Sequence, residues 1–148
     1  LFLIVWTADI AAYFVGKKFG KHKLVSRVSP GKTWEGVAGG LIAGIIVTLL
    51  AVYFLREAPS FLRIPATEIR DSFTFALLTF NSKELILLSF VTVGFSVIGD
   101  LYVSIMKREA GRKDSGVLFP GHGGVLDRID SLMAASIAYY IFILMLFI

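Results

Sequence analysis

Four long apolar stretches alternate with short polar segments along this chain. The stretch at 36–55 carries no charged residue and is long enough, as an α-helix, to cross about 30 Å of hydrocarbon. The other apolar stretches lie at 1–16, 85–106 and 132–148. This pattern predicts an all-α, polytopic transmembrane protein with about four membrane helices in this chain. The apolar run at 73–80 is too short to span a bilayer and predicts a short interfacial or buried helix.

The composition supports a membrane protein, since 56% of the 148 residues are hydrophobic and 18% are charged. The first apolar run is already under way at Leu1, so we expect a C-terminal fragment of a longer chain that has further helices upstream. Residues 1–148 would then form a single integral membrane catalytic region. The absence of cysteine excludes disulfides, thiolate metal sites and cysteine nucleophiles.

The charge balance favours anionic partners, because Lys and Arg outnumber Asp and Glu by 15 to 11. Lipid headgroups and nucleotide phosphates fit that excess, whereas no separate basic domain is present to bind nucleic acid. The first polar segment, 17–35, is strongly basic and is expected in the cytoplasm, while the balanced segment 56–84 is expected on the opposite side. For a bacterial protein the membrane would be the inner one. Two spans separate 17–35 from 104–130, so both segments should lie on the same side.

Two acidic residues interrupt the apolar stretches. A carboxylate at membrane depth is costly unless it faces a polar cavity or a partner, so Asp9 is a candidate functional residue. The alternative is that Asp9 lies near the interface and only caps or anchors its helix. Asp100 lies four residues before Ser104 and about two turns before Lys107 and Arg108, which places all four on one helical face.

Two further features of the sequence concern the position of Lys32 and the packing of the helix at 36–55. Ser29-Pro30-Gly31 is expected to form a rigid turn that fixes Lys32 at the mouth of the next helix, whereas attraction to acidic lipid explains the remaining lysines of 17–35. Gly36, Gly40 and Gly44 recur every four residues, which predicts a groove where another helix approaches closely.

The charged stretch at 104–130 is the main candidate for chemistry. Asp100, Asp127 and Asp130 come from the end of one predicted helix and the start of the next, and carboxylates gathered in this way favour a hard cation such as Mg²⁺. The number of metal ions, one or two, stays open. The neighbouring cations suit phosphate groups by charge and geometry; they are Lys107, Arg108, Arg112, Lys113 and Arg128.

A glycine loop at 121–124 completes this set. Its bare backbone can approach a ligand and offer amide donors, and His122 could serve as a phosphate hydrogen-bond donor or as a proton carrier. Acids, cations and glycines together favour phosphoryl or nucleotidyl transfer. The alternative is an ordinary cytoplasmic loop whose charges pair with one another and with lipid.

The spacing of these residues is more specific than their chemistry. The fixed positions are Ser104, Lys107-Arg108, Lys113-Asp114, Gly116, Phe119-Pro120, His122-Gly123-Gly124, Asp127-Arg128 and Asp130. This pattern resembles the signature of phosphatidate cytidylyltransferases, also called CDP-diacylglycerol synthases. The similarity extends to residues 9–13, 19–21 and 29–36.

The resemblance implies an integral membrane enzyme that depends on Mg²⁺ and converts CTP and phosphatidate into CDP-diacylglycerol and pyrophosphate. It assigns metal binding to Asp100 and Asp127, with Asp130 close by. The resemblance also implies a phosphate and nucleotide pocket lined by Lys107, Arg108, Lys113, Asp114, His122 and Arg128, and we add Ser104, Gly123, Gly124, Lys32 and Asp9 as candidate substrate-binding residues. The glycine spacing of 36–44 fits family members that pair as homodimers.

Two other classes of function stay open from the sequence. A cation-coupled carrier would use Asp9 and Asp100 as ion sites within interrupted helices, but it leaves the basic signature unexplained. A lipid-binding membrane scaffold would need only the basic loops.

Overall fold

The computed structural model describes residues 1–26, 28–62, 80–112, 115–116 and 124–147, with the side chains of 57–62, 127, 128 and 147 outside the description. The elements of these residues, in chain order, are α1 (Phe2–Phe19), β1 (Lys23–Val25), β2 (Ser29–Thr33), α2 (Trp34–Leu62), α5 (Ser82–Glu109) and α6 (Leu126–Phe147). The predicted all-α membrane class is confirmed. Within the described residues, three helical segments are long and apolar enough to cross a membrane, namely Trp34–Arg56, Ser82–Glu109 and Ile129–Leu146.

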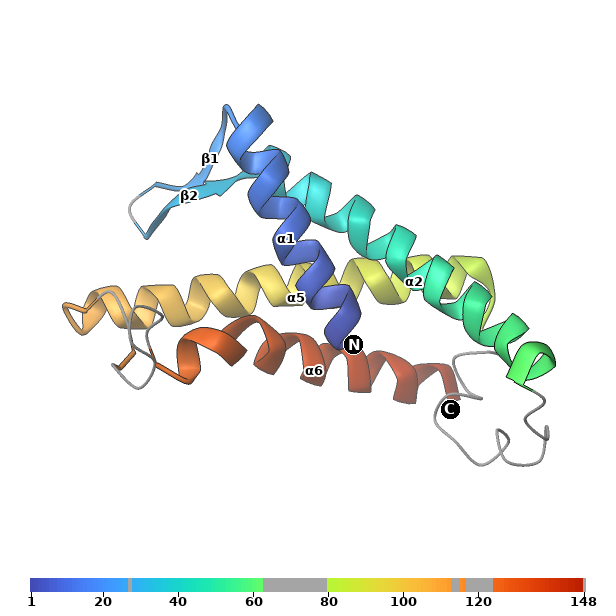
Figure 1. Ribbon diagram of the computed structural model, residues 1–148. Coiled ribbons are helices and arrows are strands. Elements are labelled where there is room, and N and C mark those ends of the chain that lie inside the picture. The colour runs from blue at the N-terminus through green and yellow to red at the C-terminus, as the bar shows by residue number, and fades with distance from the viewer. Residues whose placement is uncertain (27, 63–79, 113–114, 117–123, 148) are drawn as a thin grey trace.

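The helices pack as two pairs that cross one another (Figure 1). α1 packs mainly against α2, and α5 packs mainly against α6. Where the pairs meet, the core contains Ile4 and Ala8 of α1, Leu88 and Val93 of α5, and Tyr139 of α6. Most large apolar side chains on the outer faces are exposed, as expected of helices that face lipid rather than water.

Glycine accounts for the close approach of α2 to its neighbours. A Cβ at Gly36 would lie 2.7 Å from the carbonyl oxygen of Ala12, and one at Gly40 would lie 2.9 Å from that of Ala8. At Gly44 the obstacle would be Val93 Cγ2, at 2.7 Å. The predicted groove is therefore confirmed, and α1 and α5 of the same chain occupy it. It consequently gives no support for a homodimer, which stays a prediction.

The connection between α1 and α2 is a β-hairpin, which the sequence reading missed. β1 and β2 are antiparallel, with Lys23 opposite Thr33 and Val25 opposite Ser29. The prediction of a turn at Ser29-Pro30-Gly31 was wrong, because these residues belong to β2. A two-stranded ribbon has only edge strands, so it tolerates a proline, which cannot donate a ladder hydrogen bond.

The hairpin leads directly into α2. Thr33 Oγ1 accepts a hydrogen bond from the backbone N–H of Gly36 at 3.1 Å, which caps the start of the helix. The Glu35 carboxylate accepts from the backbone N–H of His22 at 3.2 Å, and it lies 2.7 Å from His22 Nδ1. These contacts fix Lys32, the residue before Thr33, relative to both α1 and α2.

The observed helix limits differ from the predicted ones at the ends nearest the polar segments. α2 begins before residue 36, and α6 begins at Leu126, so Asp127 and Asp130 lie within its first turns rather than ahead of it. The short helix predicted at 73–80 falls, apart from Phe80, outside the described residues.

Candidate active site

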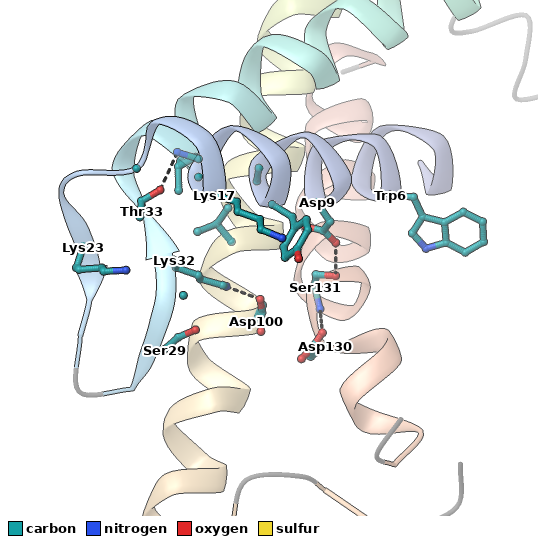
Figure 2. Close-up of a pocket in the computed structure, with 18 residues that line it drawn as sticks. Trp6, Asp9, Lys17, Lys23, Ser29, Lys32, Thr33, Asp100, Asp130 and Ser131 are labelled. Carbon is teal, nitrogen blue, oxygen red and sulfur yellow. Dashed lines mark hydrogen bonds and ion pairs between the residues drawn. The ribbon is translucent and has the colours of Figure 1, made fainter. Parts of the chain in front are cut away.

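A cavity of about 950 Å³ lies where the hairpin faces α1, α5 and α6 (Figure 2). Its lining is partly apolar, with Trp6 and Val97 among the apolar residues. The charged residues that line it fall into two groups of opposite sign, and they are Asp9, Asp100, Asp130, Lys17, Lys23 and Lys32. These side chains come from five separate elements, so only the fold brings them together.

Two of the carboxylates are joined through Ser131. Its hydroxyl group donates to Oδ2 of Asp9 at 3.3 Å, and its backbone N–H donates to Oδ1 of Asp130 at 2.8 Å. Ser131 and Asp130 are both buried. Ser131, near the start of α6, thus holds Asp9 of α1 close to Asp130 of α6.

The third carboxylate, Asp100, comes from α5 and has two polar contacts. Lys32 of β2 forms an ion pair with Asp100 Oδ2. The Ser104 hydroxyl group donates to Asp100 Oδ1 at 3.4 Å, as expected for residues four apart on one helical face. Lys32, Ser104 and Asp100 were each singled out from the sequence, and the structure places them in one cluster.

Close packing of α5 against α6 brings Asp100 near Asp130. A Cβ at Gly99 would lie 2.7 Å from Ala134 Cβ and 2.8 Å from the carbonyl oxygen of Asp130. Only glycine allows this approach, and the next residue along α5 is Asp100. Two acidic side chains are thereby held side by side at one wall of the cavity, where they interact electrostatically.

The cations that follow Asp100 on α5 lie outside the cavity lining. Lys107 interacts electrostatically with Asp130. Arg108 is exposed, and its Nε donates to the backbone carbonyl of Val28 in the hairpin at 3.3 Å. The end of α5 therefore touches the hairpin. The prediction that 17–35 and 104–130 lie on the same side of the membrane stays a prediction.

The rest of the signature is described only in part. Gly124 is buried, and a Cβ there would lie 2.8 Å from the backbone nitrogen of Gly116, so the two glycines meet. Lys113, Asp114, His122 and Gly123 lie outside the described residues, as do the side chains of Asp127 and Arg128. Their assignments stay predictions.

The carboxylates of the cavity are its candidate metal ligands. Among the described side chains, no group of three or more His, Cys, Asp or Glu residues is arranged to hold a metal. The neighbouring pair Asp100 and Asp130 nevertheless fits Mg²⁺, which takes one or two protein carboxylates and completes its shell with water and phosphate oxygens. The three-aspartate site predicted with Asp127 stays a prediction.

The sequence reading missed three residues of the cavity, Ser131, Lys17 and Lys23. Asp9, Tyr13 and Lys17 are spaced by four residues, so continuing that helical face from Asp9 would have found Lys17. Ser131 directly follows a singled-out aspartate and offers a buried hydroxyl group. Lys23 had no signal in the sequence, because only the hairpin pairing turns it toward the cavity.

Comparison with known proteins identifies relatives of the whole chain. The sequence model described as the cytidylyltransferase family matches residues 1–146. A protein named phosphatidate cytidylyltransferase from Haemophilus influenzae is 48% identical over 135 residues, which cover 91% of this chain and 41% of the relative. Proteins of the same name from Brucella suis and Pseudomonas aeruginosa are 45% and 47% identical, over 96% and 90% of this chain and 44% and 42% of their own lengths. The chain thus spans less than half the length of each of these relatives.

Proposed function

This chain belongs to the cytidylyltransferase family, as its signature predicted, and from that premise we propose that it carries the catalytic region of a phosphatidate cytidylyltransferase. The reaction would join CTP and phosphatidate to give CDP-diacylglycerol and pyrophosphate. The proposal rests chiefly on the cavity, in which carboxylates of α1, α5 and α6 face lysines of α1 and the hairpin. The names of the relatives supply the substrates.

The chemistry needs no strong base on the protein. A phosphatidate monoester is largely a dianion at neutral pH, and one of its oxygens attacks the α-phosphorus of CTP. The bond from that phosphorus to the oxygen bridging the α- and β-phosphates breaks, and pyrophosphate leaves with the electron pair. The difficulty is to bring two anions together, which falls to cations and to preorganised polar groups.

The residues of this chain would divide that task by charge. Asp100 and Asp130 are the residues that would hold Mg²⁺, which when bound offsets charge on the phosphate oxygens. Lys32, which forms an ion pair with Asp100, would contribute a positive charge near the substrate phosphates. Ser131 would hold Asp9 and Asp130 in place, and Ser104 would do the same for Asp100.

The position of the cavity fits one water-soluble and one lipid substrate. It lies at the hairpin end of α1 and α5, and Gly36 and Val37 line it close to the start of the apolar span of α2. The basic composition of 17–35 favours a cytoplasmic location for this end, and CTP would then reach it from the cytoplasm. The cation-coupled carrier considered from the sequence has no support among the relatives.

The proposal is tested by incorporation of radiolabelled CTP into lipid by the full-length protein in detergent–phosphatidate micelles with Mg²⁺. We expect labelled CDP-diacylglycerol only when all three components are present. Asp100→Asn should lower the rate by about 100-fold or more, in the range found when one preorganised polar group is removed. Glu84→Gln, at the opposite end of α5, should retain activity. No labelled lipid from the unchanged protein would overturn the proposed reaction.

A further inference from the structure

Three lysines that come from different elements line the cavity. Lys17 lies in the last turn of α1, Lys23 in β1 and Lys32 in β2. Figure 2 shows Lys23 on the hairpin turned toward Lys32, which reaches Asp100, whereas the Lys17 side chain extends along α1 toward Asp9. Lysines and aspartates thus line the same cavity.

Two of these ammonium groups have no acidic partner among the described residues. Lys32 is paired with Asp100, whereas the ion pairs of the described side chains include neither Lys17 nor Lys23. The ammonium group of Lys17 lies 5.7 Å from the centre of the Tyr13 ring, a contact that orients it without neutralising it. Like charges that line one cavity repel one another, so Lys17 and Lys23 together favour an anion with several charges.

We propose that Lys17 and Lys23 bind the β- and γ-phosphates of the nucleotide and then the pyrophosphate that leaves. This inference rests on the proposed function and assigns a subsite within it. With the α-phosphorus beside Asp100 and Asp130, the rest of the triphosphate extends toward the hairpin. As the bond to the bridging oxygen breaks, the negative charge that builds on pyrophosphate is met by the two lysines.

The position of Lys23 favours the nucleotide over the lipid as the ligand of these lysines. Lys23 lies in the hairpin, ahead of the apolar span that begins at Trp34. A lipid phosphate stays near the ends of the apolar spans because its acyl chains lie in the bilayer, whereas a triphosphate can extend into the hairpin. A triphosphate also carries more negative charge than a phosphate monoester and offers it along a longer chain of oxygens.

The test uses the full-length enzyme with Lys17→Gln, Lys23→Gln and the double variant. Three quantities are measured for each, namely the KM for CTP, the KM for phosphatidate and the inhibition constant of inorganic pyrophosphate. We expect the CTP KM and the pyrophosphate inhibition constant to rise about threefold for each single variant and about tenfold for the double variant, as expected for partly exposed cations. The phosphatidate KM should stay within twofold.

Two further variants distinguish the loss of the lysine charges from a general effect of substitution on folding. Lys18→Gln changes the neighbouring lysine, whose ammonium group lies over the Phe19 ring at 5.3 Å and which does not line the cavity; it should leave all three quantities unchanged. Lys17→Arg with Lys23→Arg preserves both charges and should restore pyrophosphate inhibition. A shifted phosphatidate KM with an unchanged pyrophosphate constant would overturn the inference.

Failure of the inference can be told apart from failure of the proposed reaction. If the unchanged enzyme forms no CDP-diacylglycerol, calorimetric titration with inorganic pyrophosphate still compares it with the double variant. Weaker pyrophosphate binding by the double variant would support the subsite, and equal binding would overturn it.

Discussion

The hydroxyl group of Ser131 in α6 donates a hydrogen bond to the Asp9 carboxylate in α1, across 122 residues of sequence. The backbone N–H of the same serine donates to Asp130. One small buried residue thus positions two acids at the cavity, one through its side chain and one through its backbone. Substitution of the side chain should release Asp9 and leave the backbone contact to Asp130 in place.

Ser131→Ala is therefore expected to lower kcat about tenfold while the KM for CTP changes little. A hydrogen bond to a charged group contributes about 1.5–3 kcal/mol, and without it the Asp9 side chain is no longer fixed. Ser131→Thr keeps the hydroxyl group and should restore most of the rate. Ser136→Ala, on the same helix, removes only a bond to the Met133 carbonyl oxygen at 2.9 Å and should behave like the unchanged enzyme. Equal loss in both alanine variants would contradict the positioning role.

The pair Asp100 and Asp130 leads to a prediction about metal dependence. Removal of divalent cations with EDTA should abolish CDP-diacylglycerol formation, and added Mg²⁺ should restore it. Asp130→Asn should raise the Mg²⁺ concentration at half-maximal rate by about tenfold or more, because loss of an anionic ligand weakens a hard-cation site. The check is a Mg²⁺ titration beside Glu84→Gln. An unchanged midpoint in Asp130→Asn would remove this residue from the metal site.

The sequence predicted the helices because their signal is local and strong. Long apolar runs predicted α2, α5 and α6. The misplaced limits, such as the start of α6 at Leu126, lie where polar residues continue a helix. The acids at Asp9 and Asp100 stood out because a carboxylate in an apolar run is costly. Ser104 stood out by its spacing from Asp100 and Asp130 by its place at the start of the next helix, and the family signature contains both residues.

The sequence predicted fewer of the tertiary contacts. The hairpin was missed because three-residue β1 is too short to show alternation and Pro30 argues against a strand. The contact of Ser131 with Asp9 depends on how α1 crosses α6, which no local pattern encodes. Arg108 was assigned to phosphate by its charge, but in the structure its guanidinium donates a hydrogen bond to the backbone carbonyl of Val28.

Gly99 sets the distance between the two acids of α5 and α6. Gly99→Ala should lower the unfolding free energy by about 1–3 kcal/mol, since its Cβ would overlap Ala134 and the Asp130 carbonyl oxygen. It should also reduce activity, because α6 and Asp130 must move away from Asp100. Gly94→Ala, on the same helix, has no atom within 4 Å of its added Cβ and should be neutral or stabilising by up to about 1 kcal/mol. Thermal unfolding in detergent, with activity at a permissive temperature, distinguishes the two variants.

The contact of Arg108 with Val28 predicts a structural role that differs from phosphate binding. Arg108→Ala should free the hairpin from the end of α5, so amide hydrogen exchange over 23–33 should become faster even without nucleotide. The hydrogen bond to an exposed backbone carbonyl is modest, and an increase of about threefold to tenfold is expected. Glu109→Ala, the exposed neighbour, provides the control. If exchange is unchanged while the KM for CTP rises, Arg108 acts on the nucleotide, and the role inferred from the signature replaces the structural one.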